Sequence, residues 1–445
     1  MSDYNFNLIN TVRSEFVKYG NIENLKNFCK SHPTYNSPSL GCFTRERTLS
    51  FRKLLSFLLY PRSKSTEIEL LEYSHLIGRP NVNKSDFSRR RRLIPADYLK
   101  AMSRDIVCGF YDSSSRVMKW HGHLLLAADG TTYSLPNTPQ VKKMYLQGRK
   151  TGRSEQALAR GVVLKDVLND TIIASNMECY GKDEIRLLLD EINALPDSLL
   201  TMQPVVILDR KYCAYTLIEP LMRKNIGFII RVKERFNKDV DSFIASGEIC
   251  RDATLTPAST SIKKLKRLYG KDAAGQFPVR LVRLSDNVVV MTTIKDESLF
   301  QPQGDIYRLR WNVETTIGFV KNNLQVEIFS SYLNNSMRQD FHARTIQYNL
   351  LSLLCHQAAE LRHDDNDRRI NRNVALGILK LEFGIFINDL SDSFYHSLTR
   401  LLNLILRFTT RVKPDRHNPR LFRKIKHSGK FITLHNYREA ILRLK

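Results

Sequence analysis

The sequence lacks the cysteine and histidine patterns of a zinc-binding or disulfide-stabilised protein. Its seven cysteines are scattered along 445 residues, are odd in number, and never form a CxxC pair. The 11 histidines form no HxxxH pair and no cluster with cysteine. This usage predicts reduced thiols and excludes both a disulfide framework and a cysteine-based zinc site.

Long apolar runs are also missing. None approaches the ~20 residues that a bilayer-spanning helix needs. The opening stretch MSDYNFNLIN has no basic segment followed by an apolar one, so it does not resemble a secretory signal. We therefore expect a cytoplasmic protein that does not associate with membranes.

Acidic residues are few relative to basic ones. The chain has 45 Asp and Glu against 69 Lys and Arg, and its formal net charge is +24. Such an excess attracts polyanions and makes their binding dependent on salt. With a membrane surface disfavoured, nucleic acid is the expected partner. The length allows about three domains.

Four polar residues stand out in the segment YRLRWNVETTIGFVK: Tyr307, Arg310, Glu314 and Lys321. At about 100° per residue on a helix they share a stripe roughly 60° wide, along the margin of an apolar face. That position suits a cleft where a carboxylate holds a metal ion and cations hold phosphate oxygens. The alternative is a surface helix with ion pairs.

Two aspartates upstream each follow an apolar run of strand length. HLLLAA precedes Asp129 and PVVIL precedes Asp209, so we expect both at strand ends. In open α/β sheets, chemistry gathers at the carboxyl ends of strands. Either aspartate alone is more typical of a turn cap, but two of them followed by the Glu314 helix predict a cluster of three acids.

The spacing Tyr-x2-Arg-x3-Glu-x6-Lys resembles the signature of the DDE transposases of the insertion-sequence-four type, which serve bacterial cut-and-paste elements. DGTT at Asp129 and LDRKY at Asp209 resemble the first and second aspartate motifs of that family, except that Lys211 stands where relatives often have glycine. The resemblance implies an α/β fold: a ribonuclease-H-like mixed sheet with an inserted β subdomain, plus α-helical N-terminal and C-terminal regions.

The resemblance also implies catalytic roles. Asp129, Asp209 and Glu314 would be the catalytic acids and would hold two Mg²⁺ ions, which Mn²⁺ can replace. Carboxylate oxygens are the ligands that such hard ions prefer. The implied reaction is cleavage of transposon ends followed by joining of the freed 3′-hydroxyl to target DNA.

DNA is the implied partner, both as the terminal inverted repeats of the transposon and as the target duplex. Tyr307, Arg310 and Lys321 would bind its phosphates. A homodimer assembled on DNA, associated with the bacterial nucleoid, is implied as well. Two alternatives stay open: a domesticated or inactive transposase that only binds DNA, and a ribonuclease-H-like nuclease that cuts DNA without terminal repeats.

Sequence patterns divide the chain into five parts. We expect a helical DNA-binding domain (1–118), the first part of the core (119–233), a β-rich insertion (234–288), the second part of the core with the catalytic helix (289–365) and a helical and basic C-terminal region (366–445). The insertion is expected to hold Ser/Thr/Lys-rich loops and a hairpin around Ser285 and Asp286. The insertion contains no tryptophan. The resemblance therefore does not predict by which route the second DNA strand is cleaved.

A helix-turn-helix-like unit is expected near the N-terminus. Its two helices would span 66–77 and 85–94, with Ser85 as the N-cap of the second. The second helix carries the candidates for DNA contact, Arg89, Arg90, Arg91 and Arg92. The alternative is a solvated basic turn, because four consecutive residues point all around a helix.

Overall fold

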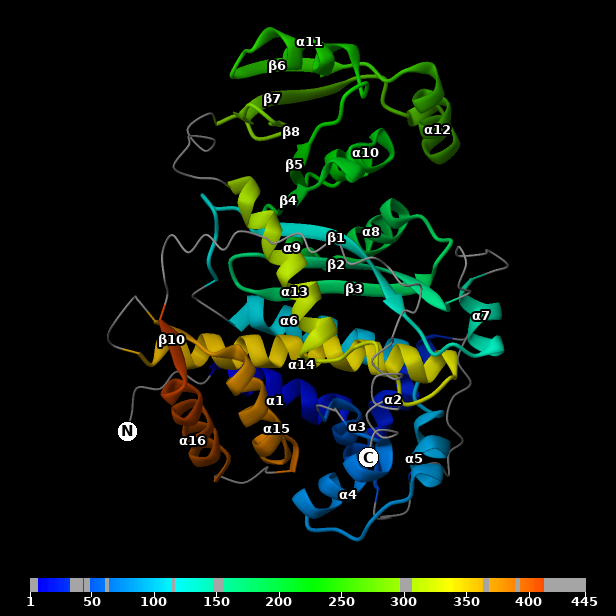
Figure 1. The fold of residues 1–445 in the computed structure, drawn as a ribbon, viewed down its shortest axis with the longest axis vertical. Coiled ribbons are helices and arrows are strands. Elements are labelled where there is room, and N and C mark those ends of the chain that lie inside the picture. Colours follow the sequence, from blue (N-terminus) through cyan, green and yellow to red (C-terminus); the bar gives the residue numbers. More distant parts are fainter. Residues whose placement is uncertain are drawn as a thin grey trace, which may run out of the picture.

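The computed structural model describes residues 7–32, 43, 49–60, 64–113, 117–146, 156–296, 306–362, 368–388 and 393–411. A single large sheet lies at its centre, with helices on both faces (Figure 1). The basic part of the expected C-terminal region, from residue 412 onward, lies outside the described residues.

The sheet has eight strands in the order β3-β2-β1-β4-β5-β8-β7-β6. The first three form an antiparallel meander, whereas β4 runs parallel to β1 and β5 runs parallel to β4. This arrangement of the first five strands confirms the predicted ribonuclease-H-like mixed sheet. The strands are β1 (Leu125–Ser134), β2 (Leu158–Asp166), β3 (Thr171–Cys179), β4 (Val205–Leu208), β5 (Gly227–Arg231), β6 (Cys250–Leu255), β7 (Phe277–Ser285) and β8 (Val288–Thr292).

The segment after β5 extends the same sheet. Strand β8 pairs antiparallel with β5, and β7 and β6 follow outward. The expected β7–β8 hairpin is present, but the expected loop region contains a helix, α12 (Ser259–Tyr269), and another helix, α11 (Lys238–Ser246), precedes β6. Helix α12 forms because its single apolar stripe can bury Leu265 while its lysines stay in water.

Alternation along β1 separates two hydrophobic clusters on the two faces of the sheet. Leu124, Leu126 and Ala128 belong to one cluster, and Leu125 and Ala127 belong to the other. The first cluster includes residues of α8 (Glu184–Asn193) and α10 (Tyr215–Arg223), whereas the second includes residues of α7 (Pro139–Tyr145) and α13 (Trp311–Asn322). The short helix α9 (Asp197–Leu200) leads into β4.

The long helix α14 (Asn334–Glu360) lies between the sheet and the N-terminal helices (Figure 1). Most of its side chains are buried, because β3 covers one side and α6 covers another. The helices of the N-terminal region are α1 (Asn7–Tyr19), α2 (Ile22–Ser31), α3 (Phe51–Leu59), α4 (Thr66–Leu76), α5 (Lys84–Arg91) and α6 (Ala96–Ser113).

The two helices of the expected helix-turn-helix-like unit are α4 and α5. The N-cap of α5 is Asn83, whose side chain accepts a hydrogen bond from the amide of Asp86, so the prediction of Ser85 as the cap was wrong. Asparagine is as good a cap as serine, and here it lies two residues earlier.

The C-terminal part packs against α14 through α15 (Arg372–Asn388) and α16 (Ser393–Arg407), next to a small ribbon of β9 (Arg368–Ile370) and β10 (Thr409–Arg411). Within the described ranges, no helix combines the length and the apolar character required to cross a bilayer.

Candidate active site

Asp129 lies on β1, and Asp209 directly follows the neighbouring parallel strand β4 in matching register. Ala127 of β1 is paired with Ile207 of β4, and each aspartate comes two residues later. Because Ala127 and Ile207 face the cluster that contains α13, both carboxylates project toward α13. The structure thus places the two acids side by side on one face of the sheet.

Asp129 does not terminate its strand as predicted. It pairs with Val163 inside β1, which continues to Ser134 because β2 accompanies it that far. The neighbouring strand β4 stops at Leu208, one residue before Asp209. The edge of β1 at Asp129 is therefore free of a partner on the β4 side, and the site opens where β4 ends.

The segment that carries Glu314 is not one continuous α-helix. Residues Ile306–Arg310 form a 3₁₀ turn, and α13 begins at Trp311. The 3₁₀ turn leaves Arg310 at the N-cap position, from which Nη2 donates to Glu314 Oε1 at 2.7 Å while Nη1 lies 3.8 Å from Asp129 Oδ2. One guanidinium therefore links an acid of β1 to the acid of α13.

Asp129 is held in an environment that disfavours its charge. The pKa of Asp129 is raised to about 6, chiefly by burial. The Gly130 amide and Arg310 lower it, and the carboxylates of Glu314 and Glu184 add to the rise. Its Oδ1 accepts the amide of Gly130 at 2.8 Å. Mutual repulsion among acids is the electrostatic condition that a bound cation relieves.

Tyr307 contributes a buried hydroxyl that lies near Arg310 but has no partner at full hydrogen-bond geometry among the described residues. Burial raises the pKa of Tyr307 to about 12, with Arg310 opposing the shift and Asp209 adding to it. Buried polar atoms are normally satisfied, so this orphaned hydroxyl retains the capacity to donate a hydrogen bond to a bound group.

Lys321 lies farther along α13, against the outer part of β1. Its Nζ donates to the carbonyl of Thr132, lies 3.5 Å from Glu327 and sits over the ring of Tyr133. The side chain of Lys321 is about one-quarter exposed. It therefore stands at the rim of the site with one neighbouring acid.

The acids are not arranged as a finished metal cage. Within the described residues, no group of three or more His, Cys, Asp or Glu side chains could hold a metal ion as placed. The guanidinium of Arg310 supplies the positive charge between Asp129 and Glu314. Oxygen donors, a raised carboxyl pKa and an arginine between two acids match the charge and donor type that a hard divalent cation requires.

Comparison with protein families gives a match over residues 120–350 to the family described as "Transposase DDE domain". The matched range covers more than half of the chain and includes Asp129, Asp209 and Glu314.

The chain belongs to this family of DDE transposases.

No curated protein matches the chain. Among solved structures, the cryo-EM structure of a piggyBac transposase synaptic complex with hairpin DNA aligns at 10% sequence identity and a TM-score of 0.45, covering 90% of this chain and 86% of that chain. So distant a likeness carries no argument about the site.

In this DDE transposase a buried acid that the sequence did not reveal lies next to Gly130, behind Asp129. Glu184, at the start of α8, is 5% exposed and accepts hydrogen bonds from Lys211 Nζ at 2.6 Å and from the Tyr212 hydroxyl at 2.8 Å. Its carboxyl carbon lies 1.9 Å from the position that a Cβ on Gly130 would occupy. A side chain at Gly130 would therefore displace the Glu184 carboxylate from its position beside Lys211 and Tyr212.

Lys211, the departure from the family motif, finds its partner in this arrangement. It follows Asp209 in the LDRKY motif and reaches across the end of β4 to Glu184. Only the motif position flagged Lys211, and nothing in the sequence pointed to Glu184, because the two residues are brought together by the tertiary fold.

The four arginines proposed for DNA contact divide into two pairs. Arg90 and Arg91 are buried: Arg90 donates to the carbonyl of Leu49, and Arg91 pairs with Asp340 of α14 at 2.9 Å. These two arginines therefore lie inside the protein, which corrects the prediction for them. Arg89 and Arg92 are exposed.

Proposed function

We propose that this chain is a transposase of the insertion-sequence-four type. It cleaves the ends of its transposon and joins the freed 3′-hydroxyl to target DNA. The proposal includes the Tyr-Arg-Glu-Lys signature of Tyr307, Arg310, Glu314 and Lys321, and a homodimer that holds two transposon ends together on DNA in the bacterial nucleoid.

One observation carries the proposal. Asp129 and Asp209 follow register-matched residues of adjacent parallel strands, and Arg310 links Asp129 to Glu314 on the helix that covers that face. These contacts support a site at the open end of β4, because an ordinary surface helix with ion pairs would have no need to link its glutamate to an acid of β1.

The residues around the acids can position DNA. The orphaned hydroxyl of Tyr307 can donate to a phosphate oxygen, and Lys321 lies at the rim with its side chain partly exposed. Arg310 neutralises Asp129 and Glu314 in the metal-free protein and can turn to a phosphate once a metal ion has taken over that role.

Asp129, Asp209 and Glu314 would hold the metal, with Mg²⁺ expected and Mn²⁺ as a substitute. Two bound ions would activate the attacking oxygen and stabilise the leaving 3′ oxygen. The protein supplies the rigid support: β1 and β4 fix the two aspartates, and the α13 face that buries Val313 and Ile317 fixes Glu314.

The decisive experiment is a cleavage assay with Mg²⁺ on the DNA that flanks the gene, including any inverted repeats. Asp129→Asn, Asp209→Asn and Glu314→Gln should each lower the cleavage rate by at least about a hundredfold, because each removes a charge that stabilises the transition state. Binding to the same DNA should persist. Asp286→Asn, in the exposed β7–β8 turn, is the matched control and should cut like the wild type.

Two results would redirect the proposal. Cutting that is equally fast on DNA without terminal repeats would favour a ribonuclease-H-like nuclease. A wild-type protein that binds the ends but never cuts, with or without metal, would favour a domesticated DNA-binding protein. The lack of a ready metal cluster among the described residues is the observation that favours this alternative.

A further inference from the structure

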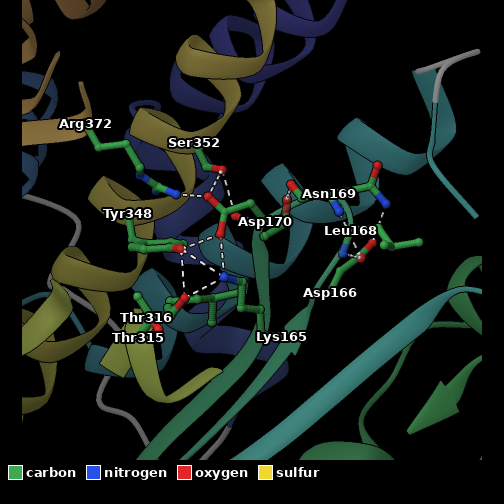
Figure 2. A network of polar contacts seen from close by, with 12 residues as sticks. Lys165, Asp166, Leu168, Asn169, Asp170, Thr315, Thr316, Tyr348, Ser352 and Arg372 are labelled. Atoms are coloured by element: carbon green, nitrogen blue, oxygen red, sulfur yellow. Dashed lines mark hydrogen bonds and ion pairs between the residues drawn. The ribbon is translucent and has the colours of Figure 1, made fainter. Parts of the chain in front are cut away.

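A buried network of charged and polar side chains lies behind the catalytic helix (Figure 2). At its centre is Lys165 of β2, whose side chain is 4% exposed. Its ammonium donates to Thr316 Oγ1 at 2.6 Å and to the Tyr348 hydroxyl at 3.3 Å, and it forms an ion pair with Asp170 in the β2–β3 turn. Strand β2, α13 and α14 meet at this lysine.

A second cation joins the same carboxylate. Arg372, at the start of α15, forms an ion pair with Asp170. Its guanidinium lies 5.3 Å from the ring centre of Phe319 and 4.8 Å from that of Tyr348. Its Nε and Nη2 have no hydrogen-bond partner in the part of the chain that the structure describes. Arg372 therefore contacts α13 through a cation–π interaction with the ring of Phe319.

Both contacts hold the side of α13 that faces away from the acid cluster. Thr316 and Phe319 follow Glu314 by two and five residues, which places them about 200° and 140° around the helix from it. Thr316 is 2% exposed, and its hydroxyl also lies 2.9 Å from the Tyr348 hydroxyl. The helix is thus fastened from behind at positions opposite to its catalytic carboxylate.

This fastening is electrostatically unfavourable for the lysine. Burial lowers the pKa of Lys165, and the neighbouring Arg372 lowers it further. An apolar side chain would fill the same space without desolvating a charge, but it would not fix the rotation of a neighbouring helix. A directional hydrogen bond to Thr316 does fix that rotation.

We propose that Lys165 is a positioning residue of the active site. Through Thr316 it sets the rotation and depth of α13, and so the place of Glu314 relative to Asp129 and Asp209. Asp170 holds Lys165 in place and ties the start of α15 to the same helix. This inference rests on the proposed function for its catalytic consequence, while its structural part can be tested without DNA or metal.

The test uses a matched set of threonine variants in the full-length protein. Thr316→Val removes the hydroxyl that Lys165 holds, and Thr316→Ser restores it. Thr345→Val is the control: Thr345 is also buried, and its hydroxyl bonds to Ser175, away from α13.

Hydrogen exchange of the metal-free protein measures how firmly Lys165 holds α13 through Thr316. In Thr316→Val, amides of residues 311–322 should exchange about fivefold faster, whereas Thr316→Ser and Thr345→Val should leave them unchanged. Lys165→Met, which keeps the length of the side chain, should act like Thr316→Val. Equal exchange in Thr316→Val and Thr345→Val would overturn the inference even if Lys165→Met fails to fold.

Single-turnover cleavage at saturating DNA reports on catalysis. Thr316→Val should cut at least about tenfold more slowly with an unchanged affinity for DNA, because a misplaced Glu314 affects the chemical step and leaves binding alone. A normal rate in Thr316→Val beside faster exchange would also overturn the positioning role. If the wild-type protein does not cut, the proposed function is wrong. The exchange data would then still show whether Lys165 holds α13 through Thr316.

Discussion

At the scale of single residues, Asp129 is the most informative side chain of the site. Its side chain is about one-quarter exposed and lies close to two other carboxylates. Arg310 compensates only part of the resulting unfavourable charge. In the unfolded chain an aspartate ionises near its reference value of 3.8, whereas in the folded protein burial raises the pKa of Asp129 to about 6. The native state therefore binds an extra proton between these two pH values.

This shift predicts how stability depends on pH. Because the folded state holds the proton more tightly, Asp129 favours folding at acid pH, and that contribution is lost as the pH rises through about 6. At pH 7 Asp129 is ionised in both states, so its buried charge lowers the stability of the folded protein by the full amount. Asp129→Asn should therefore stabilise the metal-free protein by about 2 kcal/mol at pH 7, after an allowance for partial exposure, and by nearly nothing near pH 4.

Thermal unfolding at pH 4 and pH 7 measures this difference. Addition of Mg²⁺ provides the control, because a bound ion should raise the unfolding temperature of the wild type and not that of Asp129→Asn. If Asp129→Asn is less stable than the wild type at pH 7 without metal, the repulsive environment described for Asp129 is wrong.

Sequence reasoning singled out residues that a spacing or a strand-length run marks, and it missed those that depend on tertiary contacts. The spacing from Tyr307 to Lys321 and the apolar runs before Asp129 and Asp209 were visible in one dimension. Glu184 was not, because its partners Lys211 and Tyr212 approach it only after β4 and α8 pack on the same sheet.

At the scale of elements, a buried ion pair joins α5 to α14. Arg91 is 1% exposed and pairs with Asp340, and its Nε also donates to Gln339 at 2.7 Å. A run of four arginines looks the same whether it faces DNA or the interior, so composition could not separate the inward members from Arg89 and Arg92.

Arg91→Met should destabilise the protein strongly, by about 3–5 kcal/mol, because it leaves Asp340 buried without its cation. Arg89→Met changes the same residue type two positions away on an exposed surface, and should shift stability by no more than about 0.5 kcal/mol. Urea unfolding followed by circular dichroism compares the two variants. Equal midpoints would show that Arg91 is not an internal residue.

Elements with a strong pattern were predictable, and those set by context were not. Apolar strand-length runs gave β1 and β4, and the pattern around Ser285 and Asp286 gave the β7–β8 hairpin. The break between the 3₁₀ turn at Ile306–Arg310 and α13 has no signal in residues that all favour or tolerate a helix. Helix α12 was read as loop because serine, threonine and lysine dominate it.

At the scale of the whole molecule, the net charge of +24 sets the expected behaviour toward DNA. Each phosphate neutralised by a lysine or arginine releases counterions, so affinity falls steeply with salt. Binding to a duplex without terminal repeats should weaken by at least about a hundredfold between about 50 and 200 mM salt. Fluorescence anisotropy at several salt concentrations measures the slope, with circular dichroism to verify that the protein stays folded. A flat dependence would argue against backbone contacts as the main source of affinity.

The pairing of β5 with β8 makes the added strands a stiff continuation of the catalytic sheet. A module on a flexible tether could swing freely, whereas strands joined by a ladder of hydrogen bonds bend only together. Any molecule that binds at the outermost strand β6 is thus kept at a constant distance from Asp209, which directly follows β4 in the same sheet.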